Sequence, residues 1–243
     1  MVERSYTSAV QRLRALPEVF TGSDLTVLFG WKSGIASSYL AHWRRAGFVK
    51  SLGGRSDVHM NLVRNPQVSP ELALRRAFPA GIKVGLDRLR AAAWTTQIPA
   101  RPEVAIGPTS SRYRIEGFEL VTRPEKWFQT VKPGTARASD GLDSLRPAWA
   151  LADMISRAQD KRVRHTWLPD PEDMEWPGLT TASVQNDLQA AQRAFALAPE
   201  SLTAEGYAAV YDRIFKAGGA SPAAGGMPLA RPSNLTASSR SPS

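Results

Sequence analysis

A segment near the amino terminus, residues 33–46, has the composition of a helix that contacts DNA. Its apolar residues recur at helical spacing, and the opposite side of the helix is hydroxyl-rich and basic. Serine hydroxyls can hydrogen-bond bases or phosphates, and arginine binds phosphate or pairs with guanine. We predict that this polar side enters a DNA groove through Lys32, Ser33, Ser37, Ser38, His42, Arg44 and Arg45. The apolar side, which should build a small core, consists of Ile35, Tyr39, Leu40 and Trp43.

The flanking sequence predicts the elements that hold this helix. We expect helices over 8–16 and 23–29, with Ser23 as the N-cap of the second, and strands over 48–52 and 58–63. Two glycines in the stretch GGRSD between the strands can adopt the positive φ of a hairpin turn. This order of elements predicts a winged helix-turn-helix over residues 1–68. Further DNA contacts would come from Arg55 at the wing tip, from Lys50 and from Arg64.

Net charge favours the same kind of partner. The 243 residues carry a net charge of +9, with a pI of about 10.2. Residues 1–68 hold 9 Lys and Arg against 4 Asp and Glu, a net of +5. A polyanion is therefore the expected partner. Helix-and-hairpin modules also serve as protein-docking units, which is the competing interpretation of this segment.

The remainder of the chain predicts a second, mixed α/β domain over residues 69–217, so the expected fold class is α+β. Its helices should cover 69–78, 81–97, 144–160, 181–196 and 203–217, and its short strands 103–106, 112–115 and 118–121. The Glu116-Gly117 step predicts a tight hairpin between the last two strands, and 132–143 is a loop by composition. Residues 218–243 are rich in Gly, Pro, Ser and Ala and are expected to form a disordered tail.

Residues suited to catalysis are few. The chain has no cysteine and three histidines, and it lacks a phosphate-binding loop, a nucleophile elbow and an HExxH zinc motif. Asp153 interrupts an apolar helix face, and pairing with an arginine is the favoured explanation. Four carboxylates lie close together at Asp170, Glu172, Asp173 and Glu175. We interpret them as an acidic surface loop and predict no catalytic residue, no metal and no cofactor. A nucleic-acid-processing enzyme that uses these carboxylates is the minority alternative.

The sequence gives no sign of membrane insertion or export. The first 16 residues mix charges with apolar residues, unlike a signal peptide. No uncharged apolar run approaches the roughly 18–20 residues that cross a bilayer. We therefore expect a cytoplasmic protein without membrane contact.

Four stretches carry a resemblance to a known family: YLAHWRRAGFVKSL, GIKVGLDRLRAAAWTTQIP, RIEGFELVTRPEKWF and LRPAWALADMI. In order and character they resemble the AbiEi family, the antitoxins of type IV toxin–antitoxin (abortive infection) systems. The first is similar to the family's recognition helix and wing, and the second to the helix that opens its C-terminal domain. The family often has a Gly-x-Tyr pattern after the wing turn, where this chain has Asp57-Val58-His59-Met60.

The resemblance implies two linked activities. The winged helix would bind inverted repeats in the double-stranded promoter DNA of its own operon and repress transcription. The C-terminal domain would neutralise a cognate nucleotidyltransferase-like toxin, with or without direct contact. The alternative is a winged-helix transcriptional regulator whose second domain senses a ligand or dimerises, with no toxin partner.

Overall fold

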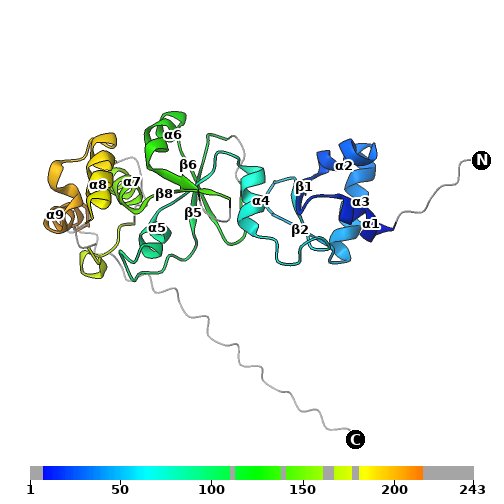
Figure 1. The fold of residues 1–243 in the computed structure, drawn as a ribbon, viewed down its shortest axis with the longest axis horizontal. Helices are drawn as coiled ribbons and strands as arrows, with labels where there is room; N and C mark the ends of the chain where they lie inside the picture. Colours follow the sequence, from blue (N-terminus) through cyan, green and yellow to red (C-terminus); the bar gives the residue numbers. More distant parts are fainter. Residues whose placement is uncertain (1–7, 110–112, 138–140, 161–166, 177–180, 216–243) are drawn as a thin grey trace, which may run out of the picture.

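The computed structural model describes residues 8–109, 113–137, 141–160, 167–176 and 181–215. The protein is of mixed α+β type with two β-sheets. It is elongated, with the first sheet and its helices at one end and the second sheet and the later helices filling the rest (Figure 1). We call residues 8–68 the head and residues 69–215 the body. The tail predicted over 218–243 lies outside the described residues.

The head combines helices with a three-stranded antiparallel sheet. Its elements are α1 (Ala9–Ala15), β1 (Val19–Thr21), α2 (Gly22–Phe29), α3 (Ser33–Arg45), β2 (Val49–Ser51) and β3 (Val58–Asn61). The strand order is β1-β3-β2. The β2–β3 hairpin was predicted from the sequence, whereas β1 was not. Phe20 of β1 lies opposite His59 of β3, and Lys50 of β2 lies opposite Met60.

Polar caps begin the first two helices. Ser8 accepts a hydrogen bond from an amide in the first turn of α1 and starts that helix. Thr21, not the predicted Ser23, caps α2, because the end of β1 places the Thr21 hydroxyl 3.3 Å from the Asp24 amide. Gly30 ends α2 in the left-handed conformation, at φ 64°. These caps set both ends of the helix that packs against α3.

The core of the head lies between the helices and one face of the sheet. Its fully buried side chains include Leu13, Leu16, Phe20, Leu25 and Trp43. The prediction that Ile35 belongs to this core is wrong, because its side chain is 47% exposed and Ala36 is buried instead. The buried residues Ala36, Leu40 and Trp43 follow an i, i+4, i+7 pattern. The buried face of α3 is therefore rotated slightly from the face predicted from the sequence.

The body is built on a five-stranded mixed sheet. In the order β6-β5-β4-β8-β7, its strands are Glu119–Thr122, Glu103–Ile106, Ile82–Val84, Asp143–Leu145 and Thr135–Arg137. β4 pairs antiparallel with β5 and parallel with β8, and β5 pairs parallel with β6. The helices are α4 (Pro70–Ala77), α5 (Leu86–Ala91), α6 (Glu125–Val131), α7 (Pro147–Gln159), α8 (Ala182–Ala194) and α9 (Ala204–Phe215). Short 3₁₀ turns lie at η1 (Lys132–Gly134), η2 (Pro171–Asp173) and η3 (Pro199–Leu202).

Different elements cover the two faces of the body sheet. Ala105 of β5 faces the large cluster formed by α5, α7, α8 and α9, whereas its neighbours Val104 and Ile106 face α4. Lys83 of β4 is nearly buried, and its Nζ lies 2.8 Å from the Glu71 carboxylate of α4. This ion pair and the apolar contacts attach α4 to the body sheet.

α4 also packs on the head, so it lies between the two sheets. It contacts β1 and β3, and every residue of β3 is buried. Leu52, Val58 and Met60 of the head share one hydrophobic cluster with Val104 and Ile106 of the body. The head and the body therefore have a common core at their junction (Figure 1).

Several sequence predictions for the body are wrong. The helix expected over 81–97 is divided, because β4 has ladder partners on both sides and Gly85, at φ 74°, separates it from α5. The turn at Glu116-Gly117 makes no hairpin: residues 113–115 are not a strand, and β6 runs parallel to β5. The loop expected over 132–143 includes η1, the edge strand β7 and the first residue of β8.

Candidate nucleic-acid interface

α3 presents a polar side to solvent. Its buried residues face the head core, and the exposed side has small residues at its start and basic residues at its end. Small side chains let a helix approach a groove closely, and basic residues reach the phosphates beside it. The structure thus brings six predicted contacts together on one exposed helix: Ser33, Ser37, Ser38, His42, Arg44 and Arg45. Lys32, at the N-cap position of α3, is exposed as well.

Stacked aromatic rings fix the turn between α2 and α3. The rings of Trp31 and Tyr39 are nearly parallel, with centroids 4.3 Å apart at an angle of 17°. Phe29 and Trp43 lie beside Trp31, with centroid separations of 4.8 and 6.0 Å. The Arg12 guanidinium of α1 lies 5.4 and 5.1 Å from the Trp31 and Tyr39 centroids, within cation–π range. This stack was not predicted from the sequence, although the spacing of the aromatic residues could have indicated it.

The surroundings of α3 are electropositive. The sequence between Asp24 and Asp57 has no carboxylate, and it includes all of α3 and β2. Both flanking carboxylates are engaged: Asp24 accepts a hydrogen bond from the Thr21 amide at 2.7 Å, and Asp57 accepts one from the Gly22 amide at 3.0 Å. The Lys and Arg residues of this stretch are Lys32, Arg44, Arg45, Lys50 and Arg55.

The turn between β2 and β3 carries the exposed Arg55 and rests on the body. Gly53 and Gly54 have φ of 95° and 61°. A Cβ on Gly54 would lie 3.0 Å from the backbone nitrogen and oxygen of Arg114. Arg114 is itself exposed, and sequence analysis did not single it out. Lys50 is exposed on β2, so the predicted hairpin contacts remain accessible.

A buried histidine, beside an exposed aspartate, lies after the turn between β2 and β3, where the sequence departs from the Gly-x-Tyr pattern. The His59 ring packs on Phe20 with centroids 5.6 Å apart, and its Nε2 lies 3.6 Å from Asp57 Oδ1. Burial lowers the pKa of His59 below its ordinary value; Asp57 opposes this effect, and Arg44 adds to it. The neutral imidazole is therefore the favoured form in the folded protein.

Arg64 has a structural partner. Its Nη1 donates hydrogen bonds to the carbonyl oxygens of Arg14, at 2.9 Å, and Leu16, at 3.4 Å. These bonds satisfy carbonyl groups at the end of α1. The side chain stays exposed, but replacing it would disturb the end of α1 as well as any phosphate contact.

Asp153 and Asp173, two of the carboxylates considered for catalysis, accept hydrogen bonds from other side chains of the fold. Asp153 is 2% exposed, and its Oδ2 lies 2.8 Å from Arg123 Nη2, which confirms the predicted pairing with an arginine. Its Oδ1 accepts a hydrogen bond from Trp127 Nε1 at 2.7 Å. Asp173 accepts one from the Gln97 side chain. Within the described ranges, no group of three or more His, Asp and Glu side chains is arranged to hold a metal.

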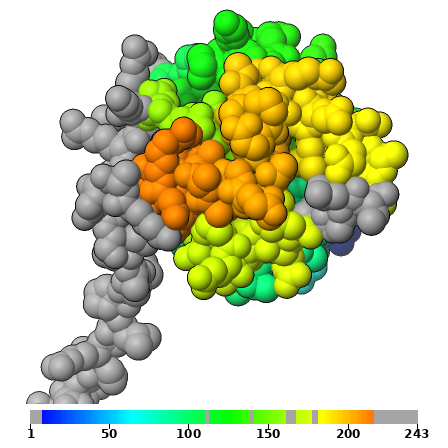
Figure 2. Space-filling model, turned by 90° about the vertical axis from the view of Figure 1, so that its left-hand side faces the viewer, coloured from blue at the N-terminus to red at the C-terminus, as the bar shows by residue number. Residues whose placement is uncertain are grey.

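The described residues after position 166, which lie at the end of the molecule opposite the head, are acidic. Residues 167–215 have a net charge of −6, from Asp170, Glu172, Asp173, Glu175, Asp187, Glu200, Glu205 and Asp212 against Arg193 and Arg213. Figure 2 views this end, where α9 (orange) and α8 (yellow) form much of the surface. Electrostatic attraction to a polyanion would therefore turn the head toward it and the far end away.

No protein-family profile matches the chain, and no curated protein matches it in sequence. Among solved structures, it is similar to the Rv2827c protein from Mycobacterium tuberculosis, with a TM-score of 0.53 and 19% sequence identity. The similarity covers 84% of this chain and 78% of that one, and at this identity it concerns the fold alone. Within the described part of the chain, no helix is both long and apolar enough to span a bilayer.

Proposed function

We propose that this protein is a type IV antitoxin of the AbiEi kind, whose head is a winged helix that binds and represses its own promoter. The observation that carries DNA binding is the exposed side of α3, which is small, hydroxyl-bearing and basic, with no carboxylate in the helix. The element order α1-β1-α2-α3-β2-β3 and the strand order β1-β3-β2 are those expected of a winged helix, which supports this proposal.

In this proposal, α3 lies in the major groove and the turn between β2 and β3 lies over the adjoining backbone. The Ser38 hydroxyl donates to the Gly34 carbonyl at 2.9 Å, which leaves its oxygen lone pairs as acceptors for an adenine or cytosine amino group. Arg44, Arg45 and Arg55 bind phosphates and supply most of the affinity.

The antitoxin half of the proposal rests on the resemblance to the AbiEi family. The body would oppose a nucleotidyltransferase-like toxin in the cytoplasm. A transcriptional regulator without a toxin would use the same head, so the two functions differ in what the body does.

Binding of the full chain to the DNA upstream of its own gene tests the first half. We expect a retarded complex with that fragment and markedly weaker binding to a scrambled fragment of equal length and composition. Equal binding to both fragments would refute autorepression.

Co-expression with the neighbouring gene tests the second half. If that gene encodes a nucleotidyltransferase that arrests growth, we expect this protein to restore growth. If no neighbouring gene encodes such an enzyme, or if growth is not restored, the antitoxin function is wrong and the regulator without a toxin is favoured.

A further inference from the structure

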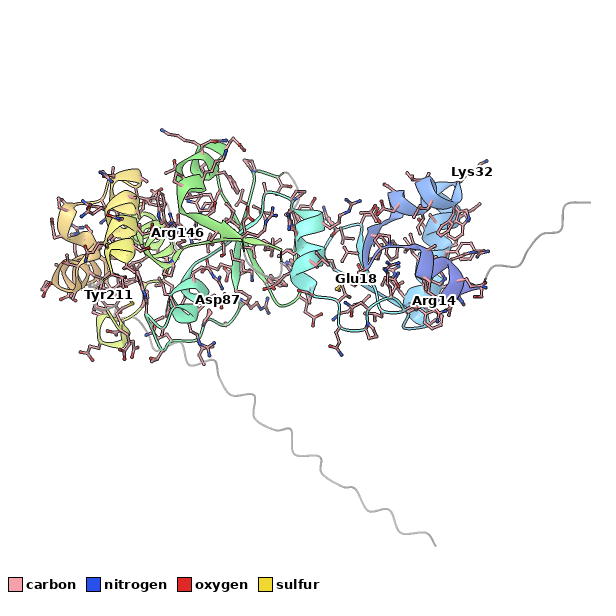
Figure 3. All side chains as sticks on the ribbon, viewed as in Figure 1. Arg14, Glu18, Lys32, Asp87, Arg146 and Tyr211 are labelled. Atoms are coloured by element: carbon pink, nitrogen blue, oxygen red, sulfur yellow. The ribbon has the colours of Figure 1, made fainter. Side chains whose placement is uncertain are left out.

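A crevice of about 550 Å³ lies at the junction of the head and the body. Pro17 and Val19, where the head passes from α1 into β1, form one apolar wall, and Leu72 and Pro79 of the α4 region form the other. Glu18, labelled in Figure 3 on the side of the head that faces α4, marks its position. Its volume falls in the range of about 300–1,000 Å³ that is typical of small-molecule sites.

Three charged side chains also line the crevice, and two of them have partners. Glu18 accepts a hydrogen bond from the Asn65 side chain at 3.3 Å, and Arg76 Nη2 lies 3.2 Å from Asp24 Oδ1. Arg75 is partly buried, yet it makes no hydrogen bond or ion pair with any residue that the structure describes. The crevice therefore combines apolar walls with the Arg75 guanidinium, which has no partner among the described residues, and with the Glu18 carboxylate, which a neutral amide holds.

We infer that this crevice binds a small organic anion. Its carboxylate or sulfonate group pairs with Arg75, and its apolar body lies against Pro17, Val19, Leu72 and Pro79. A guanidinium offers two parallel N–H donors to such a group, which makes the contact both charged and directional. The apolar walls select against simple inorganic anions, because these gain nothing from apolar contact.

The site is connected to the first turn of α2. Arg76, next to Arg75 in the chain, pairs with Asp24, and Asp24 holds the Thr21 amide at the start of α2. An anion on Arg75 also attracts Arg76 and weakens its pairing with Asp24. Occupancy of the crevice therefore loosens the helix that packs against α3, which lowers DNA affinity. This regulatory consequence, unlike the binding itself, rests on the proposed function.

A fluorescent probe tests the binding. 8-Anilinonaphthalene-1-sulfonate, which has an aromatic body and one sulfonate, is titrated into the folded full chain. Arg75→Gln should weaken its binding about tenfold or more, because a charge-assisted hydrogen bond is lost, and Arg75→Lys should keep most of it. Arg193→Gln, on α8 at the far end, is the matched control and should leave binding unchanged. Octanoate should displace the probe, and inorganic phosphate at equal concentration should not.

Equal probe affinity in the wild type and Arg75→Gln, or no displacement by octanoate, would overturn the inference. Circular dichroism of each variant distinguishes loss of the site from loss of the fold. Arg75→Gln should fold normally, because Arg75 has no hydrogen-bond or ion-pair partner within the described residues. In a second measurement, octanoate should weaken promoter binding by the wild type but not by Arg75→Gln. If the protein binds the probe at Arg75 but no promoter DNA, the proposed function fails and the crevice site stands.

Discussion

Arg44 and Arg45 allow the sharpest test of the proposed contact between α3 and DNA. Both side chains are exposed in the last turn of α3, and Arg45 Nε donates to the Ala41 carbonyl of its own helix, at 3.4 Å. Replacing both with alanine should change the free energy of unfolding by no more than about 0.5 kcal/mol, as is typical of exposed positions. A loss of DNA affinity would then report the contacts themselves.

The size of the effect follows from the release of counterions. Each phosphate contact contributes about −0.9 to the slope of log affinity against log salt, so the double variant should have a slope less steep by about 1.8. Between about 50 and about 200 mM salt, the ratio of wild-type to variant affinity should therefore fall about twelvefold. Fluorescence anisotropy with the upstream fragment measures this ratio.

The matched control is Arg193→Ala with Arg213→Ala, which removes two exposed arginines from the acidic far end. Its affinity and its salt slope should equal those of the wild type. A weaker complex with an unchanged salt slope in Arg44→Ala/Arg45→Ala would refute phosphate contact by these arginines. Unchanged affinity would refute the placement of α3 on DNA.

Three further predictions concern stability. Asp153→Ala should lower the free energy of unfolding, measured with urea, by about 3–5 kcal/mol, because it leaves the Arg123 guanidinium buried without its carboxylate. The double variant Asp153→Leu with Arg123→Met should lose far less stability. Equal losses of stability in the two proteins would contradict this prediction. Gly54→Ala should lower the free energy of unfolding by about 2 kcal/mol, because of the positive φ and the contact of the new Cβ with the Arg114 backbone. Gly117→Ala, which has a positive φ but no neighbouring atoms, should lower it by about 1 kcal/mol. If the loss at Gly54 is no larger than at Gly117, the turn does not rest on the body. Burial lowers the pKa of His59 in the folded state. Once the pH falls through about 6.5, the ordinary pKa of histidine, the unfolded chain therefore binds more protons than the folded one. The free energy of unfolding should decrease from that pH down to the pKa of His59 in the folded state. His59→Phe should remove this decrease, measured as the difference from wild type, and an identical pH profile would argue against a buried neutral imidazole.

The helices and the hairpin of the head were predicted well because local signals agree there. The glycine-bearing turn after β2, the helical spacing of Leu40 and Trp43 and the polar side of α3 all favour the same elements. The errors in the head are local. Ala36 is buried and the larger Ile35 is exposed, because Trp43 and its contact with Trp31 set the rotation of α3 about its axis.

The body was predicted less well because its strands depend on distant partners. Ile82–Val84 continues into a helix and shares its apolar pattern, so only pairing with β5 and β8 identifies it as a strand. The Glu116-Gly117 turn has the composition of a hairpin turn. Residues 113–115 before it form no strand, however, and β6 after it pairs in parallel with β5. Arg75 gave no local signal either, because its surroundings come from the head and the body together.

The position of α4 between two sheets determines where the chain can be divided. Ending it at residue 68 would bring Leu52, Val58 and Met60 into water, at about 1.5–3 kcal/mol for each side chain. Such a fragment would expose an apolar sheet face next to the open edge of β2 and would tend to self-associate. Ending the chain after Phe78 keeps α4 on that face. The smallest head fragment that keeps Leu52, Val58 and Met60 covered thus includes α4.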